Sequence, residues 1–194
     1  MEVAALRPVL PAAGPGVARF APGHASEDAR LVGQARSGDE GAFGLLYDRY
    51  ARVVHGLLLA RVPRADVDDL VQNVFLAAWR RLEALRDPAA FGGWLSMIAR
   101  NQATDFHRRT IDHGQHVELP PDLPAHDGTP ALAEAHAALD VIRSLPEAYR
   151  ETLVLRLVEG LTGPEIADRT GLTAASVRVN LHRGMKMLRE RLDR

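Results

Sequence analysis

Apolar residues recur at three- and four-residue spacing along four segments of the first half of the chain, which predicts four amphipathic helices. Ser26 and Asp39 are placed to cap the first two helices, and Gly38 separates them. Asp66 is placed to cap the third helix, and Pro88 suits the first turn of the fourth. Short connections between these helices predict a compact bundle. The inner faces predicted in this way are Ala29, Val32 and Ala35; Phe43, Leu46, Tyr47, Tyr50, Val53, Val54, Leu57 and Leu58; Leu70, Val74, Phe75, Ala78 and Leu82; and Phe91, Leu95, Ile98, Gln102 and Phe106.

A helix-turn-helix pattern follows in the second half. Helical spacing returns near Ala131 and ends at Gly160. Residues 162–165 then form a capping box with a proline in the first turn, which predicts a short helix. Gly171 supplies a tight turn, and Thr173 can cap a longer last helix. A short helix that braces a longer one is the arrangement that places side chains in a DNA major groove.

The segment between the two helical regions has a different composition. From Ile111 to Asp140 there are six acidic residues and no Lys or Arg, with four prolines through the middle. Residues 1–25 are rich in Ala, Pro and Gly and have no periodicity. We therefore predict an all-α protein with two small helical domains joined by a flexible acidic linker. The predicted boundaries are a disordered arm at 1–25, a four-helix domain at 26–110, a linker at 111–133 and a helix-turn-helix domain at 134–194.

The total charge does not indicate a nucleic-acid-binding protein, because the 194 residues have a formal net charge of −1. The charge of the last helix differs from that of the whole chain. Between Thr173 and Arg194 six basic residues stand against two acidic ones, which favours DNA binding by the helix-turn-helix. The alternative for this segment is a helical hairpin with a solvated arginine face.

Several classes of protein are disfavoured by what the sequence lacks. It contains no cysteine, which excludes disulfides, thiolate metal sites and thiol catalysis. Prolines interrupt every apolar run near the start before it reaches signal-peptide length, and no later run approaches the roughly 20 residues of a membrane span. We expect a cytoplasmic protein with no membrane insertion and no regulatory domain appended after the last helix.

Four histidines are the main argument for a metal site or an enzyme. They are His113, His116, His126 and His136, with Asp112 and Asp127 nearby. They lie in or next to the proline-rich segment, which gives no rigid ligand spacing, and the sequence offers no nucleophile paired with a base. We therefore expect no catalysis and no cofactor. The stronger alternative function is a helix-turn-helix regulator that binds duplex DNA without a polymerase.

Two blocks of sequence resemble the extracytoplasmic-function sigma factors of bacterial RNA polymerase. The segment DVDDLVQNVFLAAWR at 66–80, followed by Phe91, Trp94-Leu95 and IARN at 98–101, resembles their conserved region two. The segments LPE at 145–147, EGLT at 159–162 and EIA at 165–167, and the residues Val177-Arg178 with Leu181-His182-Arg183, resemble their region four. Both blocks have the order and spacing of the family from about Ser26 to Leu192. The resemblance implies a non-enzymatic subunit that recognises and opens promoters.

The resemblance also implies site residues in the first domain. The third helix would dock on a coiled coil of the largest subunit of core RNA polymerase through Asp69, Gln72, Asn73, Arg80 and Arg81. The segment before the fourth helix, and that helix, would hold the separated minus-ten strand through Arg86, Asp87, Phe91, Arg100, Asn101, Thr104, Arg108 and Arg109. Phe91 and Trp94 also fit a helix core, and for these two side chains the pattern favours burial over stacking on a base.

In the second domain the resemblance implies recognition of the minus-thirty-five element of promoter DNA. The residues so implied are Thr173, Ser176, Arg178, Asn180, His182, Arg183 and Lys186. An anti-sigma protein is implied as a further partner. The chain departs from the family pattern at Gly92-Gly93, where members usually have a polar and a basic residue, and at Val179-Asn180 and Met185. These departures leave the promoter sequence open.

Overall fold

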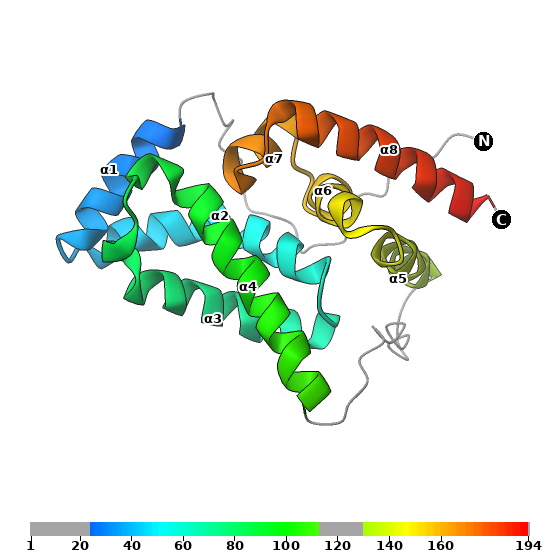
Figure 1. Ribbon diagram of the computed structural model, residues 1–194, viewed down its shortest axis with the longest axis horizontal. Helices are drawn as coiled ribbons and strands as arrows, with labels where there is room; N and C mark the ends of the chain where they lie inside the picture. Colours follow the sequence, from blue (N-terminus) through cyan, green and yellow to red (C-terminus); the bar gives the residue numbers. More distant parts are fainter. Residues whose placement is uncertain (1–23, 113–129, 194) are drawn as a thin grey trace.

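The computed structural model describes residues 24–112 and 130–193, and within these ranges every regular element is a helix (Figure 1). The α-helices are α1 (His24–Arg36), α2 (Glu40–Leu59), α3 (Val67–Arg80), α4 (Phe91–Asp112), α5 (Pro130–Arg143), α6 (Glu147–Leu157), α7 (Gly163–Thr170) and α8 (Ala174–Leu192). The 3₁₀ segments are η1 (Arg64–Asp66), η2 (Leu82–Ala84) and η3 (Pro88–Ala90). The prediction of an all-α fold is confirmed. Among the described helices, none is long and apolar enough to cross a membrane.

The described helices form two groups along the chain, which we call the bundle (α1–α4) and the second domain (α5–α8). The predicted arm at 1–25 and the predicted linker at 111–133 fall almost wholly outside the described residues. Only their inner ends are described, and these belong to helices: α1 starts at His24, α4 extends to Asp112 and α5 starts at Pro130. The predicted domain boundaries therefore stay predictions.

Helix α2 packs against the other three helices of the bundle. Its inner face is fully buried, because apolar residues at three- and four-residue spacing fall on one stripe of a helix. The most buried of these residues are Leu46, Val53, Val54, Leu57 and Leu58. Phe91 and Leu95 of α4 and Val74 of α3 complete this core. The polar faces of α3 and α4 are left on the outside, where a partner can reach them.

Side-chain caps fix the starts of α2 and of η3 in the bundle. Asp39 accepts a hydrogen bond from the backbone N–H of Ala42 (3.1 Å) at the start of α2, and Gly38 before it has φ = 93°, as the predicted cap and break require. Asp87 accepts from the N–H of Ala89 (3.0 Å) and starts η3, which leads directly into α4. The predicted Ser26 cap is wrong. Because α1 already begins at His24, Ser26 lies inside the first turn, where a helix tolerates serine.

A buried polar cluster ties α1 to α2. The carboxylate of Asp28 accepts hydrogen bonds from Tyr50 Oη and from the guanidinium of Arg49. Burial, and then the negative charge of Asp28, raise the pKa of Tyr50, so its hydroxyl stays protonated and remains a donor. This bond satisfies a carboxylate that the fold has almost entirely removed from water.

The second domain has the predicted helix-turn-helix. At the start of α7, Thr162 accepts from the N–H of Glu165 (3.4 Å) and the Glu165 carboxylate accepts from the N–H of Thr162 (2.7 Å), which is the predicted capping box. Gly171 takes φ = 75° in the turn, and Thr173 accepts from the N–H of Ser176 (3.1 Å) to start α8. Gly184 lets α8 approach α6, because a Cβ there would lie 3.0 Å from the side chain of Leu153.

The two groups of helices pack against each other through α2 and α4 on one side and α6 and α7 on the other. Four charged residues of the second domain are buried at or beside this boundary. One of them, Arg169, donates to the carbonyl oxygen of Arg49 in α2 (3.3 Å). Arg143 donates to the carbonyl oxygens of Leu59 (3.0 Å) and Val62 (3.1 Å), which lie at and just beyond the end of α2. The carboxylate of Glu159 accepts from His55 Nδ1 (2.7 Å), and Glu151 meets two arginines of the bundle described below.

We predict that Tyr50→Phe lowers the free energy of unfolding by about 1–2 kcal/mol, because Asp28 loses a hydrogen-bond donor in a buried place. Urea unfolding followed by circular dichroism measures this change. The control is Tyr47→Phe on the same helix, whose hydroxyl lies at the surface, and it should change the unfolding free energy by less than about 0.5 kcal/mol. Equal losses in the two variants would show that the Tyr50 hydroxyl has no special role.

Candidate nucleic-acid interface

The outer face of α3 carries the residues predicted to bind core polymerase. Asp69, Gln72 and Asn73 are all exposed, and Arg80 and Arg81 are exposed where the helix ends. Asp66 stands at the N-cap position as predicted, but its side chain makes no capping hydrogen bond. The five predicted residues thus lie on or just beyond one solvent-facing helix.

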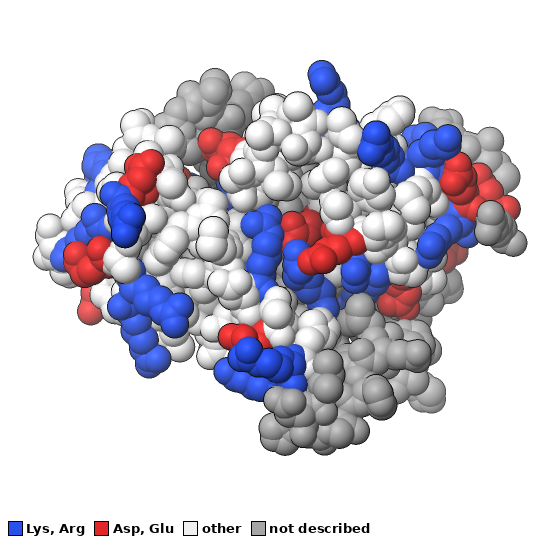
Figure 2. All heavy atoms as spheres, viewed as in Figure 1, with Lys and Arg blue, Asp and Glu red and all other residues white. Residues whose placement is uncertain are grey.

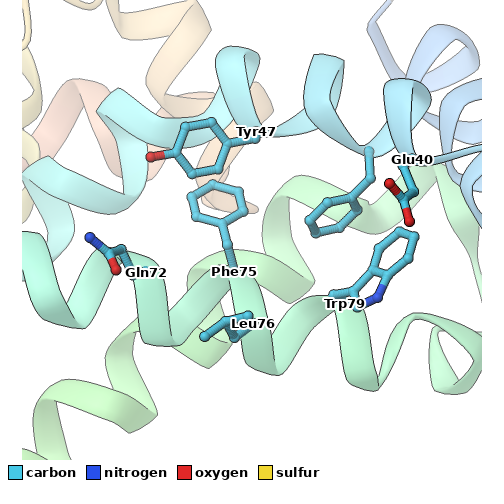
Figure 3. Close-up of a pocket in the computed structure, with 7 residues that line it drawn as sticks. Glu40, Tyr47, Gln72, Phe75, Leu76 and Trp79 are labelled. Carbon is cyan, nitrogen blue, oxygen red and sulfur yellow. The ribbon is translucent and has the colours of Figure 1, made fainter.

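An apolar groove lies beside this face, between α2 and α3, with a volume of about 440 Å³ (Figure 3). Its wall on α3 is formed by Gln72, Phe75, Leu76 and Trp79, and Tyr47 faces them from α2. Glu40 and Phe43 complete the lining. Gln72 therefore belongs both to the predicted polar face and to the groove.

The groove exposes large apolar side chains that have no role in the core. Leu76 is 52% exposed and Trp79 is 38% exposed. Tyr47, which the periodicity placed on the inner face of α2, is 39% exposed, so that prediction is wrong. Tyr47 lies at the edge of the apolar face of α2, where its ring packs over Phe75 with centroids 4.5 Å apart. Contiguous exposed apolar surface of this kind is typical of protein-docking sites.

The sequence prediction missed Leu76 and Trp79, although a signal for them was present. They follow Gln72 by four and seven residues, so on a helix they share its face. The indole of Trp79 packs edge-on against Phe43, with ring centroids 4.7 Å apart. Aromatic rings held in this way offer a partner a rigid apolar surface with little conformational entropy left to lose.

The predicted minus-ten residues are mostly at the surface. Arg86 and Asp87 are exposed before α4, and Asn101, Arg108 and Arg109 are exposed along it. Thr104 is exposed as well, and its hydroxyl donates to the carbonyl of Arg100 one turn earlier (3.0 Å). Arg100 is partly buried and has protein partners of its own.

Phe91 lies in the core. It is 0% exposed and packs between Tyr50 and Trp94, with ring centroids 5.3 Å and 5.9 Å away. It has no free face for a base, so direct stacking by Phe91 is incompatible with this arrangement, and burial, which the sequence pattern favoured, is what the structure has. Trp94 is partly buried against the same core. The polar residues around η3 and α4 are left as the candidates for a contact with DNA.

Helix α8 presents the predicted minus-thirty-five residues. Val177, Gly184 and Leu188 are buried, which turns the opposite side of the helix to solvent. The exposed set is Thr173, Ser176, Arg178, His182, Arg183 and Lys186, while Asn180 is partly buried. Basic side chains gather over the right-hand end of this face of the molecule, where α8 lies (Figure 2). Thr173 and Ser176 form the N-terminal cap of α8. Arg178 is the first long polar side chain of α8 that takes no part in this cap.

The described residues contain no group of three or more His, Asp and Glu side chains that could hold a metal ion. Of the four histidines considered above, His113, His116 and His126 lie outside the described part of the chain. The ring of His136 contacts the guanidinium of Arg64.

Comparison with known proteins assigns both groups of helices. Residues 46–110 match the family described as Sigma-70 region 2, and residues 135–188 match Sigma-70, region 4. The chain is 31% identical over 182 residues to the ECF RNA polymerase sigma-E factor of Haemophilus influenzae, covering 86% of this chain and 95% of that protein. The chain belongs to the extracytoplasmic-function sigma factors. It is an RNA polymerase sigma factor with a region-two and a region-four domain, as the resemblance predicted.

Other sigma factors are similar over most of their length. The ECF RNA polymerase sigma-E factor of Escherichia coli K12 is 31% identical over 181 residues, covering 83% of this chain and 92% of that protein. The solved structure of CnrH in complex with the cytosolic domain of CnrY is 30% identical, with a TM-score of 0.58, and covers 86% of this chain and 97% of that one. The comparisons give no support to a regulator that acts without polymerase.

In this sigma factor, regions two and four meet at an ion-pair cluster. Glu151 of α6 is 7% exposed and accepts hydrogen bonds from Arg61 Nε (2.9 Å), Arg100 Nε (3.0 Å) and Arg100 Nη2 (3.1 Å). Arg61 also pairs with Glu147. Basic and acidic side chains lie together in the middle of the face shown in Figure 2. Arg100, predicted to contact minus-ten DNA, is thus held by a carboxylate of the other domain.

Two opposing effects act on the Glu151 carboxyl. Burial alone would raise its pKa, but the hydrogen bonds and positive charges of Arg100 and Arg61 outweigh burial and hold the pKa below its usual value. A carboxyl whose pKa is lowered by folding stabilises the folded state at any pH above its unfolded value. That contribution is lost as the pH falls through the lowered pKa of the folded state.

We predict that Glu151→Gln lowers the free energy of unfolding by about 1–3 kcal/mol at pH 7, because two guanidinium groups lose their charged partner. The difference from the wild type should begin to shrink as the pH falls below about 4.5, where the carboxyl of the unfolded chain takes up a proton, and should be lost below the lowered pKa of the folded state. Urea unfolding of both proteins over a pH series measures this. Glu147→Gln is the control, since Glu147 is exposed and should contribute little at any pH. A difference independent of pH would contradict the assignment to charge.

Proposed function

We propose that this sigma factor divides its work among three surfaces: α3 and its groove dock on core RNA polymerase, α4 and the segment before it hold the separated minus-ten strand, and α8 reads the minus-thirty-five element. The observation that carries the proposal is the exposed apolar groove beside Asp69 and Gln72 on α3. It supplies a protein-docking surface on the helix where the family resemblance expects core polymerase.

The groove and the polar face of α3 complement each other as a docking surface. Leu76 and Trp79 would fill pockets of the partner, since aromatic and large apolar anchors contribute most of the binding free energy at protein interfaces. Asp69, Gln72, Asn73, Arg80 and Arg81 would form the polar rim that sets orientation. The occupant that we propose is a helical coiled coil of the largest polymerase subunit.

The minus-ten contacts are proposed for the exposed polar residues around α4. Arg86, Arg100, Arg108 and Arg109 would meet phosphates of the separated strand, and Asn101 would hydrogen-bond a base edge. Asp87 and Thr104 would act through the backbone geometry that their hydrogen bonds maintain. Phe91 would support this surface from the core.

The minus-thirty-five contacts are proposed for the N-terminal half of α8. Arg178 and Asn180 have the donors that read guanine and adenine in the major groove. Ser176 and His182 would contact neighbouring base edges or phosphates, and Arg183 and Lys186 would mainly bind phosphates. The buried side of α8 supports this orientation, because Val177 and Leu188 fix which side of the helix faces outward.

Each DNA-binding surface should bind DNA weakly on its own, because each has only a few basic residues and the affinity of such contacts falls steeply as the salt concentration rises. Fixing both domains on one polymerase raises the effective concentration of the second contact once the first has formed. We therefore propose that the protein binds promoter DNA as part of the polymerase, acts in the cytoplasm and is not itself an enzyme. CnrH was solved with CnrY, and RpoE of Bartonella quintana with the anti-sigma factor NepR, which supports an anti-sigma partner here.

Run-off transcription with purified core polymerase tests the proposal. The chain should confer initiation at a defined start site on a promoter template, and core alone should not. Leu76→Ser should weaken core binding about tenfold or more, measured by fluorescence anisotropy, because it removes an apolar anchor. Leu45→Ser is the control: Leu45 is an equally exposed leucine (55%) on α2 that does not line the groove. Equal effects of the two changes would contradict docking at the groove.

We predict that Arg178→Ala weakens promoter recognition by about 1–3 kcal/mol while core binding is unchanged, because one base-reading contact is lost. The measurement is run-off transcription on templates with and without the minus-thirty-five element. Arg30→Ala in α1 is the charge-matched control, since Arg30 is exposed and pairs only with its own helix. A loss of the same size on both templates would place Arg178 among general phosphate contacts instead.

A further inference from the structure

Val179 is an exposed apolar residue in the middle of the surface of α8 that we propose for the minus-thirty-five element. Its side chain is 40% exposed, and it is not among the described residues that pack in the apolar core. Single exposed apolar residues are common on protein surfaces and usually need no explanation. Val179 differs from these because it lies among polar side chains that are proposed to bind DNA.

Helix geometry places Val179 on the outermost side of α8. In Figure 1 this helix lies along the upper edge of the molecule, with α5 and α6 below it. Its buried residues Val177, Gly184 and Leu188 mark the inner side. Because an α-helix turns about 100° per residue, Val179 lies between about 140° and 180° around the helix axis from each of these three. The side chain therefore faces away from the rest of region four.

Basic side chains surround Val179. Arg178 and Arg183 are exposed on either side of it, and Lys186 is exposed about two turns further along the same face. Ala175, one turn before Val179, is also exposed, and its short side chain leaves room for α8 to approach a partner closely. When the basic groups bind DNA as proposed, Val179 is brought against the base pairs and loses its contact with water.

The chemistry of valine limits what Val179 can recognise there. Its two methyl groups neither donate nor accept hydrogen bonds. In the major groove guanine, adenine and cytosine present hydrogen-bonding groups, whereas thymine also presents its C5-methyl group. A valine that covers the amino group of cytosine or the N7 and O6 of guanine removes water from these groups without replacing the lost hydrogen bonds, which is unfavourable. A valine against the thymine methyl buries apolar surface on both sides of the contact.

We propose that Val179 is a specificity-determining residue: it contacts the C5-methyl group of a thymine in the minus-thirty-five element and makes this sigma factor prefer thymine at that base pair. The inference rests on the proposed function for the assignment of α8 to promoter DNA. It adds an apolar contact to the polar contacts proposed for Arg178 and Asn180. The effect of one such contact is modest, since burying one methyl-sized group changes an affinity about fourfold.

The test removes the methyl group and the valine separately. Holoenzyme formed from core polymerase and the full chain selects among duplex fragments randomised in the minus-ten and minus-thirty-five elements, and the bound fragments are sequenced. We expect thymine to be preferred at one or more positions of the minus-thirty-five element. Each such thymidine is then replaced singly by deoxyuridine, which differs only in lacking the methyl group, and the affinity of the holoenzyme is measured by competition against a labelled duplex.

At one of these positions deoxyuridine should weaken binding of the wild type about three- to fivefold. Val179→Ser should weaken binding to the thymidine duplex by a similar factor and should bind the deoxyuridine duplex equally well, because its contact with the methyl group is already lost. Val179→Ile keeps a branched apolar side chain and should retain the difference between the two duplexes. Leu192→Ser is the matched control, since Leu192 is an exposed apolar residue at the far end of α8, and it should behave as the wild type. Circular dichroism checks that all three variants remain helical.

The proposal is overturned if no thymine is preferred, or if no deoxyuridine substitution weakens binding of the wild type. It is also overturned if Val179→Ser leaves the difference between thymidine and deoxyuridine intact at every position, whatever its overall affinity. Arg178→Ala separates these outcomes from the proposed function. Binding that depends on Arg178 and on the minus-thirty-five sequence without any effect of the methyl group contradicts the thymine contact alone, whereas a holoenzyme that ignores the minus-thirty-five sequence contradicts both proposals.

Discussion

The carboxylate of Glu151 depends on two guanidinium groups from the other domain, and the arrangement of the whole molecule depends on that contact. A carboxylate removed from water is tolerated only when charged donors replace the lost hydration. Arg61 and Arg100 provide these donors from the end of α2 and the middle of α4. They fix the position of α6 on the bundle, and with it the position of α7 on the first turn of α4. A purely apolar contact of the same area would hold the domains together with less control over their relative position.

The same contact explains how a DNA-binding protein can have almost no net charge. Part of its positive charge is neutralised inside the molecule, where Glu151 and Glu159 face Arg61, Arg100, Arg52 and His55. The surface of α8 keeps its positive field, since the ion pair between Lys186 and Glu190 on its outer face is long (4.0 Å) and exposed. Total charge therefore says little about the charge of an individual surface. The quantity that matters for DNA binding is the net charge of each exposed surface.

Local signals allowed much of the fold to be predicted from sequence, because the forces involved act within three or four residues. The caps at Asp39, Thr162 and Thr173 and the turn at Gly171 are of this kind. The cap predicted at Ser26 was wrong because serine is common at the N-cap position but also occurs inside the first turn of a helix. Leu76 and Trp79 were not among the predicted site residues, which were all polar or charged on this helix, although their spacing from Gln72 put them on the outer face. The pairing of Arg100 with Glu151 joins residues 51 positions apart, and no local pattern encodes it.

The Gly92-Gly93 pair, one of the departures from the family pattern, lies where the two domains meet. Gly92 and Gly93 each weaken the start of α4 by about 1 kcal/mol relative to alanine, which a helix-stability argument alone would count against the sequence. Against that cost stands the close approach of Arg169, which a side chain at Gly92 would obstruct, since its Cβ would lie 2.9 Å from the Arg169 carbonyl oxygen. Gly56 serves the same approach from α2, against Leu155 and Glu159. Gly56 and Gly92 thus each lie against region four, and Gly92 also makes room for the ring of Tyr50 within the bundle, where a Cβ would lie 2.8 Å from it.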